Sequence, residues 1–173
     1  NLYSYKKIIP AYREECNRYI VTFDDDVIYP KNTLETLLKI SKNFPNDVIA
    51  NRVHKIKVLN QLPDNYDNWC HNYKKDSTLN FLTGVGGVLY PPQCFDKNFF
   101  NLKDIEKLSP TNDDIWINWM LKLNKKVIRY SFINTHYELI KLIKGGLYKK
   151  NVKQKNNDLQ IKLMIKKYGF PFL

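Results

Sequence analysis

Three consecutive aspartates, Asp24, Asp25 and Asp26, follow the apolar run "YIVTF". The β-branched and aromatic residues of that run are typical of a buried strand, and Pro30 excludes regular strand pairing shortly after the triplet. Three neighbouring carboxylates repel one another and cannot all be satisfied inside a core. The triplet therefore needs either a cation opposite it or water around it.

The chemistry that suits such a triplet is the binding of a divalent cation. Two carboxylates in the spacing Asp-x-Asp can point at one ion, and their hard oxygen atoms suit Mg²⁺ or Mn²⁺. An ion held by so few protein groups usually completes its shell with water and substrate phosphates, which indicates a nucleotide-diphosphate substrate. The position agrees with this, because open α/β sheets bind ligands beyond the carboxyl ends of their strands. A solvated acidic loop is the alternative that the triplet alone leaves open.

A second acidic pair, Asp113 and Asp114, begins the segment "DDIWINWMLKL". Carboxylates in a first helical turn cap amide groups and interact favourably with the helix dipole, so one of the two can be structural. The other can face a cleft and act as a general base toward a substrate hydroxyl. Trp116 and Trp119 offer flat apolar surface for a sugar ring, although at least one of them is expected to pack in the core.

The elements that would hold these side chains alternate between strand and helix patterns. Strands are predicted at 19–23, 48–53 and 126–133, and helices at 33–43, from about 111, and at 159–168. The segment "LNFLTGVGGVLYPP" predicts two short strands hinged on Gly84, Gly86 and Gly87, and residues 54–78 are expected to form a long loop.

The two central helices have recognisable starts and apolar faces. Asn32 is predicted to cap the helix at 33–43, with Glu35 three residues later. Its apolar stripe is predicted to comprise Leu34, Leu37 and Leu38. The buried face of the helix near 111 is predicted to comprise Ile115, Trp116, Trp119, Met120 and Leu123.

Composition and charge narrow the class of protein. The 173 residues are 43% hydrophobic and 14% aromatic, which is enough for one α/β domain with a well-filled core. There is no apolar run of transmembrane length and no cleavable signal at the start. Cys16, Cys70 and Cys94 follow no metal or disulfide spacing, which favours a reducing, cytoplasmic compartment.

The net charge of +11 calls for an anionic partner or surface. Nucleic acid is not expected, because no nucleic-acid-binding motif is present. The basic residues are concentrated in 141–167, where Asp158 is the one acid. This tail would suit a peripheral contact with the inner face of a membrane, or it forms a solvated basic surface.

The order of these motifs resembles bacterial glycosyltransferases of the GT-A fold, which build cell-surface polysaccharides from nucleotide sugars. The motifs are "SYKKIIPAY", "YIVTFDDDVIYPKNTLETLL", "LTGVGGVLYPP" and "PTNDDIWINWMLKLNKKVI", and the resemblance covers about residues 3–137. It implies a Rossmann-like mixed sheet flanked by helices, with a catalytic domain at 1–140 and a basic, partly helical tail at 141–173. It also implies a nucleotide-sugar donor and a saccharide or glycolipid acceptor.

The resemblance assigns roles to individual residues. Asp24 and Asp26 would bind Mn²⁺ or Mg²⁺, with Asp24 and Asp25 also contacting the metal shell or the ribose. The family's glycine-rich loop near the donor sugar and acceptor matches residues 84–87, of which Gly86 and Gly87 would contact substrate, and Trp116 would lie beside the sugar. Asp113 or Asp114 would be the catalytic base of an inverting enzyme.

Three further residues complete the expected site. His136 resembles the late histidine that completes the metal shell in some GT-A enzymes. Lys6 or Lys7 would stabilise the departing diphosphate with its positive charge.

The chain departs from the family at its front. GT-A domains open with a strand–loop–helix unit that holds the nucleotide base, and that unit precedes everything seen here. We therefore expect an N-terminally truncated domain that on its own binds nucleotide sugars weakly and is nearly inactive.

A rival interpretation comes from another class of enzyme. "VTFDDDV" also fits the first motif of haloacid dehalogenase-like phosphatases, with Asp24 as nucleophile and Thr83 in their second motif. Their last acidic motif should end an apolar strand, whereas "KLSPT" precedes Asp113 and Asp114. The motif order therefore favours the glycosyltransferase.

Overall fold

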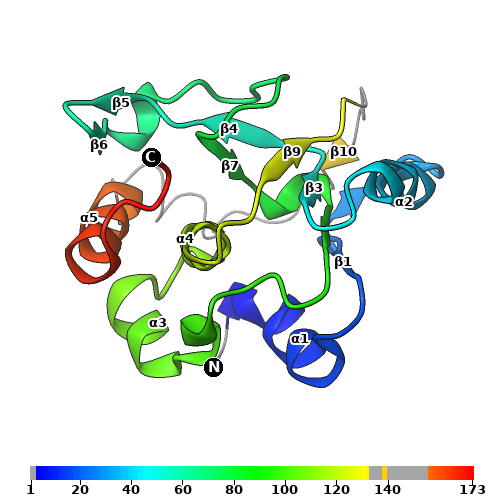
Figure 1. Cartoon of the computed structure of the whole chain (residues 1–173), viewed down its shortest axis with the longest axis horizontal. Coiled ribbons are helices and arrows are strands. Elements are labelled where there is room, and N and C mark those ends of the chain that lie inside the picture. Colours follow the sequence, from blue (N-terminus) through cyan, green and yellow to red (C-terminus); the bar gives the residue numbers. More distant parts are fainter. Residues whose placement is uncertain (1–2, 133–137, 140–155) are drawn as a thin grey trace.

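The computed structural model describes residues 3–132, 138–139 and 156–173 (Figure 1). Its centre is a four-stranded mixed sheet in the order β1-β8-β3-β9. The strands are β1 (Ile20–Thr22), β8 (Val88–Tyr90), β3 (Val48–Ala50) and β9 (Ile128–Tyr130). β8 runs antiparallel to both β1 and β3, whereas β3 and β9 are parallel. A mixed α/β architecture is therefore confirmed.

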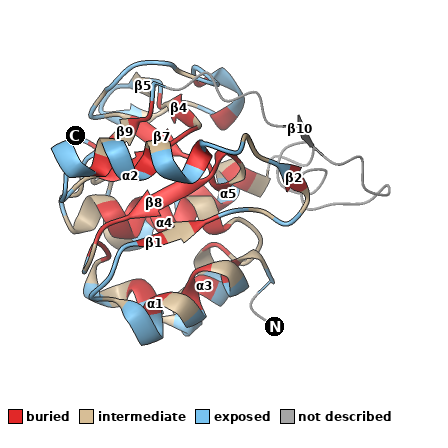
Figure 2. Ribbon diagram, turned by 90° about the vertical axis from the view of Figure 1, so that its right-hand side faces the viewer, coloured by how far each residue is buried: buried red, intermediate tan, exposed pale blue. Residues whose placement is uncertain are grey.

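Helices cover both faces of this sheet. They are α1 (Ile9–Glu15), α2 (Thr33–Asn43), α3 (Leu102–Leu108), α4 (Asp113–Leu123) and α5 (Asn156–Tyr168). Leu37 of α2 packs with Ile49 and Leu89 in a small cluster on one face. The alternate side chains of β3 and β8 belong to the main core, which also contains much of α4. Buried residues are accordingly concentrated in β8 and α4 (Figure 2).

Shorter strands form two-stranded sheets beside the central sheet. β4 (Val53–Lys55) pairs with β7 (Asn80–Leu82), β5 (Val58–Leu59) with β6 (Leu62–Pro63), and β2 (Val27–Ile28) with β10 (Glu138–Leu139). Single 3₁₀ turns lie at η1 (Tyr3–Lys7), η2 (Tyr66–Asn68), η3 (Gly84–Gly86) and η4 (Lys97–Phe100).

Most of the strongly patterned elements are confirmed. The predicted helix at 33–43 is α2 with the same bounds, and the helices expected from about 111 and at 159–168 are α4 and α5. The strands expected at 19–23 and 126–133 contain β1 and β9. The two strands expected around the glycines are β7 and β8.

Two other predictions are wrong. Residues 48–53 do not form one strand, because the chain turns at Asn51–Arg52 and continues as β4 in a different sheet. Residues 54–78 are not one long loop, since they contain the rest of β4, the β5–β6 hairpin and η2. The pattern also missed α1 and α3, which are only seven residues each and too short for a clear helical period.

The start and apolar face of α2 also differ from the prediction. Asn32 is the N-cap residue, but its side chain makes no capping hydrogen bond within the described chain. The Thr36 hydroxyl instead donates to the Asn32 carbonyl at 2.8 Å. Leu34 and Leu38 are 46% and 41% exposed, so of the predicted stripe only Leu37 is buried.

The last helix belongs to the main core. Ile161, Met164 and Phe172 are buried in it, and the Trp119 indole N–H donates to the Gly169 carbonyl at 3.0 Å. Residues 156–173 therefore form an integral layer over α3 and α4. Within the described ranges, no helix has the length and apolar character needed to cross a bilayer.

Candidate functional site

A cavity of about 860 Å³ collects the chemically active side chains. It lies among the loop after β1, the glycine loop between β7 and β8, the start of α4, and η1. The predicted acids and lysines all line it: Lys6, Lys7, Asp24, Asp25, Asp26, Asp113 and Asp114. The fold thus brings together motifs that are about a hundred positions apart in the chain.

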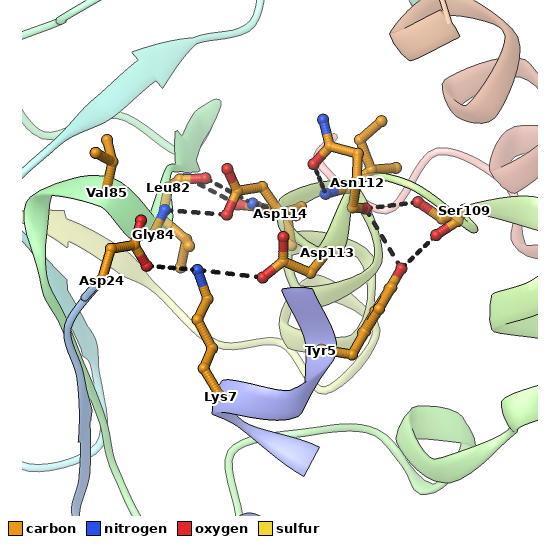
Figure 3. Close-up of polar contacts among 12 residues, drawn as sticks. Tyr5, Lys7, Asp24, Leu82, Gly84, Val85, Ser109, Asn112, Asp113 and Asp114 are labelled. Atoms are coloured by element: carbon orange, nitrogen blue, oxygen red, sulfur yellow. Dashed lines mark hydrogen bonds and ion pairs between the residues drawn. The ribbon is translucent and has the colours of Figure 1, made fainter. Parts of the chain in front are cut away.

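Lys7 connects the two acidic motifs (Figure 3). Its ammonium Nζ lies 2.9 Å from Asp24 Oδ1 and 3.3 Å from Asp113 Oδ2. Burial alone would lower the pKa of Lys7, but the carboxylates of Asp113, Asp114 and Asp24 together raise it well above its ordinary value. Lys7 therefore stays charged and acts as a bridge inside the cavity.

Burial changes the pKa of the Asp114 carboxyl group. Its Oδ1 accepts the Gly84 N–H at 2.9 Å, and its other oxygen has no partner among the described residues. Burial, together with the charge of Asp113, raises the pKa of Asp114 to about 7 even though Lys7 opposes the shift. A carboxyl group that titrates near neutral pH can both accept and release a proton there.

The side chain that caps α4 is that of Asn112, and neither acid makes a capping hydrogen bond within the described residues. The Asn112 side-chain oxygen accepts the Ile115 N–H at 3.4 Å. The Asn118 side chain exchanges two hydrogen bonds with the backbone of Leu82, at 2.8 and 2.9 Å. These contacts lock α4 against β7 and leave both acids directed at the cavity.

The N-terminal turn is held against the same helix start. The Tyr5 hydroxyl in η1 donates to the Ser109 carbonyl, 104 positions away in the chain. On the other side, the Tyr29 hydroxyl accepts the Asp24 N–H at 3.0 Å and donates to the Val85 carbonyl at 2.8 Å. Tyr5 therefore fixes the turn that carries Lys7, and Tyr29 ties the triplet to the glycine loop.

Gly84 lies beside the charged side chains of the cavity, whereas Gly86 and Gly87 pack against other parts of the chain. A Cβ at Gly84 would lie 2.6 Å from Lys7 Nζ and 3.3 Å from Asp114 Oδ1, so a hydrogen is needed there. Gly86 and Gly87, which were predicted to contact substrate, lie behind the cavity wall. A Cβ at Gly86 would meet the Arg52 Cβ at 2.8 Å, and Gly87 has a φ of +87° and faces Phe23. The site glycine is thus Gly84.

Trp116 does not form a surface for a sugar ring. It is 0% exposed, and its indole N–H donates to the Phe99 carbonyl at 3.1 Å. Trp119 is equally buried. Both tryptophans are core residues, and the aromatic side chains that line the cavity are Phe23 and Tyr66.

The triplet itself partly fits a divalent cation. Asp24 is engaged by Lys7, whereas Asp25 and Asp26 line the cavity and have no hydrogen-bond or ion-pair partner in the described part of the chain. In residues 3–132, 138–139 and 156–173, no group of three or more acids, histidines or cysteines is placed to hold a metal. Two free carboxylates suit an ion that takes its other ligands from water and phosphate. His136 lies outside the described residues.

The cavity is also lined by residues that sequence reasoning missed. They are Arg52, His54, Tyr66 and His71, and they join Thr83, which only the phosphatase interpretation had singled out. The Arg52 Nε donates to the Asn72 side-chain oxygen at 2.7 Å, and Nη1 donates to Thr83 Oγ1 at 3.2 Å. The signal was the spacing Arg-x-His before a strand, because residues i and i+2 of an extended chain share a face.

His54 is held in one neutral form. Its Nδ1 accepts the Asn72 backbone N–H at 3.2 Å, and its ring centroid lies 4.3 Å from that of His71. Burial first, and then the charges of Arg52 and His71, lower the pKa of His54 to about 3. With Nδ1 as an acceptor, the ring carries its proton on Nε2.

Comparison with known proteins adds no family to this site: no protein-family model and no curated protein matches the chain.

Proposed function

We propose that the chain forms the catalytic part of a glycosyltransferase that moves a sugar from a nucleotide-diphosphate donor to an acceptor hydroxyl. The observation that carries the proposal is the joining of both acidic motifs in one cavity through Lys7. One motif keeps free carboxylates for a cation, and the other contains an acid that titrates near neutral pH. Sugar transfer to a hydroxyl needs both functions.

The triplet supports the donor side of this reaction. Asp25 and Asp26 would hold Mn²⁺ or Mg²⁺, and the ion would supply positive charge to the departing diphosphate. Lys7 is already shared by Asp24 and Asp113, so its role is to position these acids and not to bind phosphate. Lys6 lines the same cavity, is exposed, and has no partner among the described residues, which leaves it for the diphosphate.

Asp114 supports the acceptor side. The Gly84 N–H holds one of its oxygens, and the second remains to take the proton of the acceptor hydroxyl. At neutral pH a substantial share of Asp114 is ionised, which suits a general base. A carboxylate base that activates the acceptor directly leads to inversion at the anomeric carbon.

The phosphatase interpretation keeps one supporting observation. Asp24 and Thr83, its first and second motif residues, line the same cavity. That activity would pass through an aspartyl-phosphate: Asp24 would form the bond to phosphorus as the ester oxygen leaves. Trapping such a phosphorylated Asp24 would favour it over sugar transfer.

The test is a screen of nucleotide sugars with this protein, in Mn²⁺ and in a chelator, that measures release of nucleoside diphosphate. Asp26→Asn should abolish the Mn²⁺-dependent binding of the donor and leave the fold intact. Asp114→Asn should bind the donor normally and lose at least a hundredfold in turnover. Asp67→Asn, an exposed acid outside the cavity, is the matched control. Normal turnover by Asp114→Asn would remove it as the base.

A further inference from the structure

The part of the cavity lined by Arg52, His54 and Thr83 offers mainly hydrogen-bond donors. Arg52 uses two of its five N–H groups on an amide oxygen and a hydroxyl, and no acid pairs with it in the described chain. Its positive charge is therefore uncompensated. The same cavity is lined by five carboxylates, yet none of them pairs with Arg52, so its remaining N–H groups are left for another anion.

Two buried side chains beside Arg52 add donors directed into the same space. His54 is 1% exposed, lines the cavity and accepts the Asn72 N–H at Nδ1, which leaves its proton on Nε2. Thr83 is 3% exposed; its oxygen accepts from Arg52, and its hydroxyl proton has no acceptor within the described ranges. Buried donors without an acceptor are costly, so a ligand that supplies oxygen atoms would be bound favourably here.

A metal ion does not suit this part of the cavity. The Nε2 atom of neutral His54 carries its proton because Nδ1 is already an acceptor. Arg52 would also repel a cation. What matches an arginine fork, an imidazole N–H and a hydroxyl is an anion with several oxygen atoms.

We infer that Arg52, His54 and Thr83 form an anion subsite, which takes a phosphate or carboxylate group carried by the acceptor. Only the assignment of this anionic group to the acceptor rests on the proposed function. The position follows from adjacent residues: Thr83 contacts Arg52 at 3.2 Å, and Gly84, the next residue, contacts Asp114 at 2.9 Å. An anionic group at the subsite and a hydroxyl at Asp114 can therefore belong to one sugar unit.

Gly86 explains how Arg52 reaches this position. A Cβ there would lie 2.8 Å from the Arg52 Cβ and 2.9 Å from its backbone nitrogen. The Asn51 side chain donates to the Gly86 carbonyl at 3.0 Å, and the Thr83 N–H donates to the Arg52 carbonyl at 3.1 Å. The glycine loop therefore holds the β3–β4 turn, and with it the guanidinium.

The test is an equilibrium titration of the folded chain with inorganic phosphate, and with glucuronate against glucose, followed by the NMR signal of the His54 Nε2–H. Phosphate and glucuronate should shift this signal, and glucose should not. Arg52→Gln should weaken both affinities at least tenfold, and Arg52→Lys should recover part of the loss. Arg18→Gln, an exposed arginine paired with Glu15, should bind like the parent. Unchanged affinity in Arg52→Gln would overturn the subsite.

A second titration identifies whether the donor or the acceptor carries the anionic group. Titration with a uridine diphosphate–Mn²⁺ mixture in saturating phosphate should leave the His54 signal in its bound position. Displacement of phosphate by the diphosphate would overturn the assignment to the acceptor, because the subsite would then serve the donor. Since no sugar transfer is measured, inactivity with every nucleotide sugar would count against the proposed function and not against the subsite.

Discussion

At the scale of single residues, the site depends on one ammonium group. Lys7 lies between Asp24 and Asp113, and both contacts are largely shielded from solvent. Removing one partner of a buried charge cluster leaves the others desolvated and unpaired, which costs more than the contact itself contributed. Lys7 therefore determines whether three neighbouring acids can share a cavity.

The variant Lys7→Met should lose about 3 kcal/mol of unfolding free energy at pH 7, because the carboxylates of the cavity lose their counter-charge. The loss should be smaller at pH 5, where Asp114 is protonated and no longer needs a counter-charge. Urea unfolding at the two pH values measures both effects. Lys6→Met, at an exposed lysine next in the chain, should change stability by no more than about 0.5 kcal/mol. Equal losses at both pH values would contradict the electrostatic explanation.

Asp114 should give stability a characteristic pH dependence. Its pKa is raised from 3.8 in the unfolded chain to about 7 in the folded one, so the folded state binds its proton more tightly. The stabilisation is complete below pH 3.8 and is lost as the pH rises through about 7. Asp114→Asn should therefore become more stable relative to the parent over this interval. Unfolding free energies at several pH values test this, and Asp67→Asn should follow the parent throughout.

At the scale of elements, the start of α4 positions the acids and the glycine loop accommodates them. Asn112 caps the helix, while Asn118 bonds the backbone of Leu82 in β7. The cap and the acids are consecutive residues, so any fraying of this turn moves both carboxyls. The element therefore couples helix stability to the geometry of the cavity.

Two variants that each remove an N-cap asparagine separate the loss of helix stability from the displacement of the acids. Asn112→Ala and Asn101→Ala each remove a capping side chain, from α4 and from α3, and each should cost about 0.5–2 kcal/mol. Only Asn112→Ala should also weaken the pH dependence of stability that Asp114 causes, since Asn101 lies outside the cavity. Thermal unfolding across pH compares the two. The same pH profile for both variants would show that the cap does not position Asp114.

The sequence predicts well those elements whose structure is determined by the spacing of their own residues. α2 and α4 have regular apolar spacing, and the acids and lysines of the site were all found because their types and spacing are visible in the chain. The break between β3 and β4 was missed because it depends on the distant Gly86 packing against Arg52. Trp116 was misplaced for a related reason: α4 is buried nearly all round, so its period does not show which side faces the cavity.

At the scale of the whole molecule, one core links both ends of the described chain. Tyr5 and Ile9 near the start share it with Ile161, Met164 and Phe172 near the end, around the tryptophans of α4. A site built on α4 therefore depends on α5, although α5 carries none of the five carboxylates that line the cavity. Stability of the cavity should follow the stability of the entire domain.

The variant Met164→Ala tests this dependence. It removes a fully buried side chain from α5 and should cost about 2–5 kcal/mol. Unfolding followed by fluorescence and by circular dichroism should give the same midpoint, lowered for both probes, since α5 is part of one cooperative unit. Leu159→Ala, on the exposed side of the same helix, is the matched control. A separate early transition limited to helix content would show that α5 unfolds independently.

The hydrogen bond from Tyr5 to Ser109 has a consequence for the order of events during synthesis. Residues 104 positions apart must meet before η1 can hold Lys7 against α4. At a usual rate of translation, Asp113 is made roughly 4–17 seconds after the aspartate triplet. During that interval the nascent chain has its acidic loop but lacks the helix that completes the cavity. Such distant contacts also slow the folding search, so the site should be among the last features of the newborn protein to form.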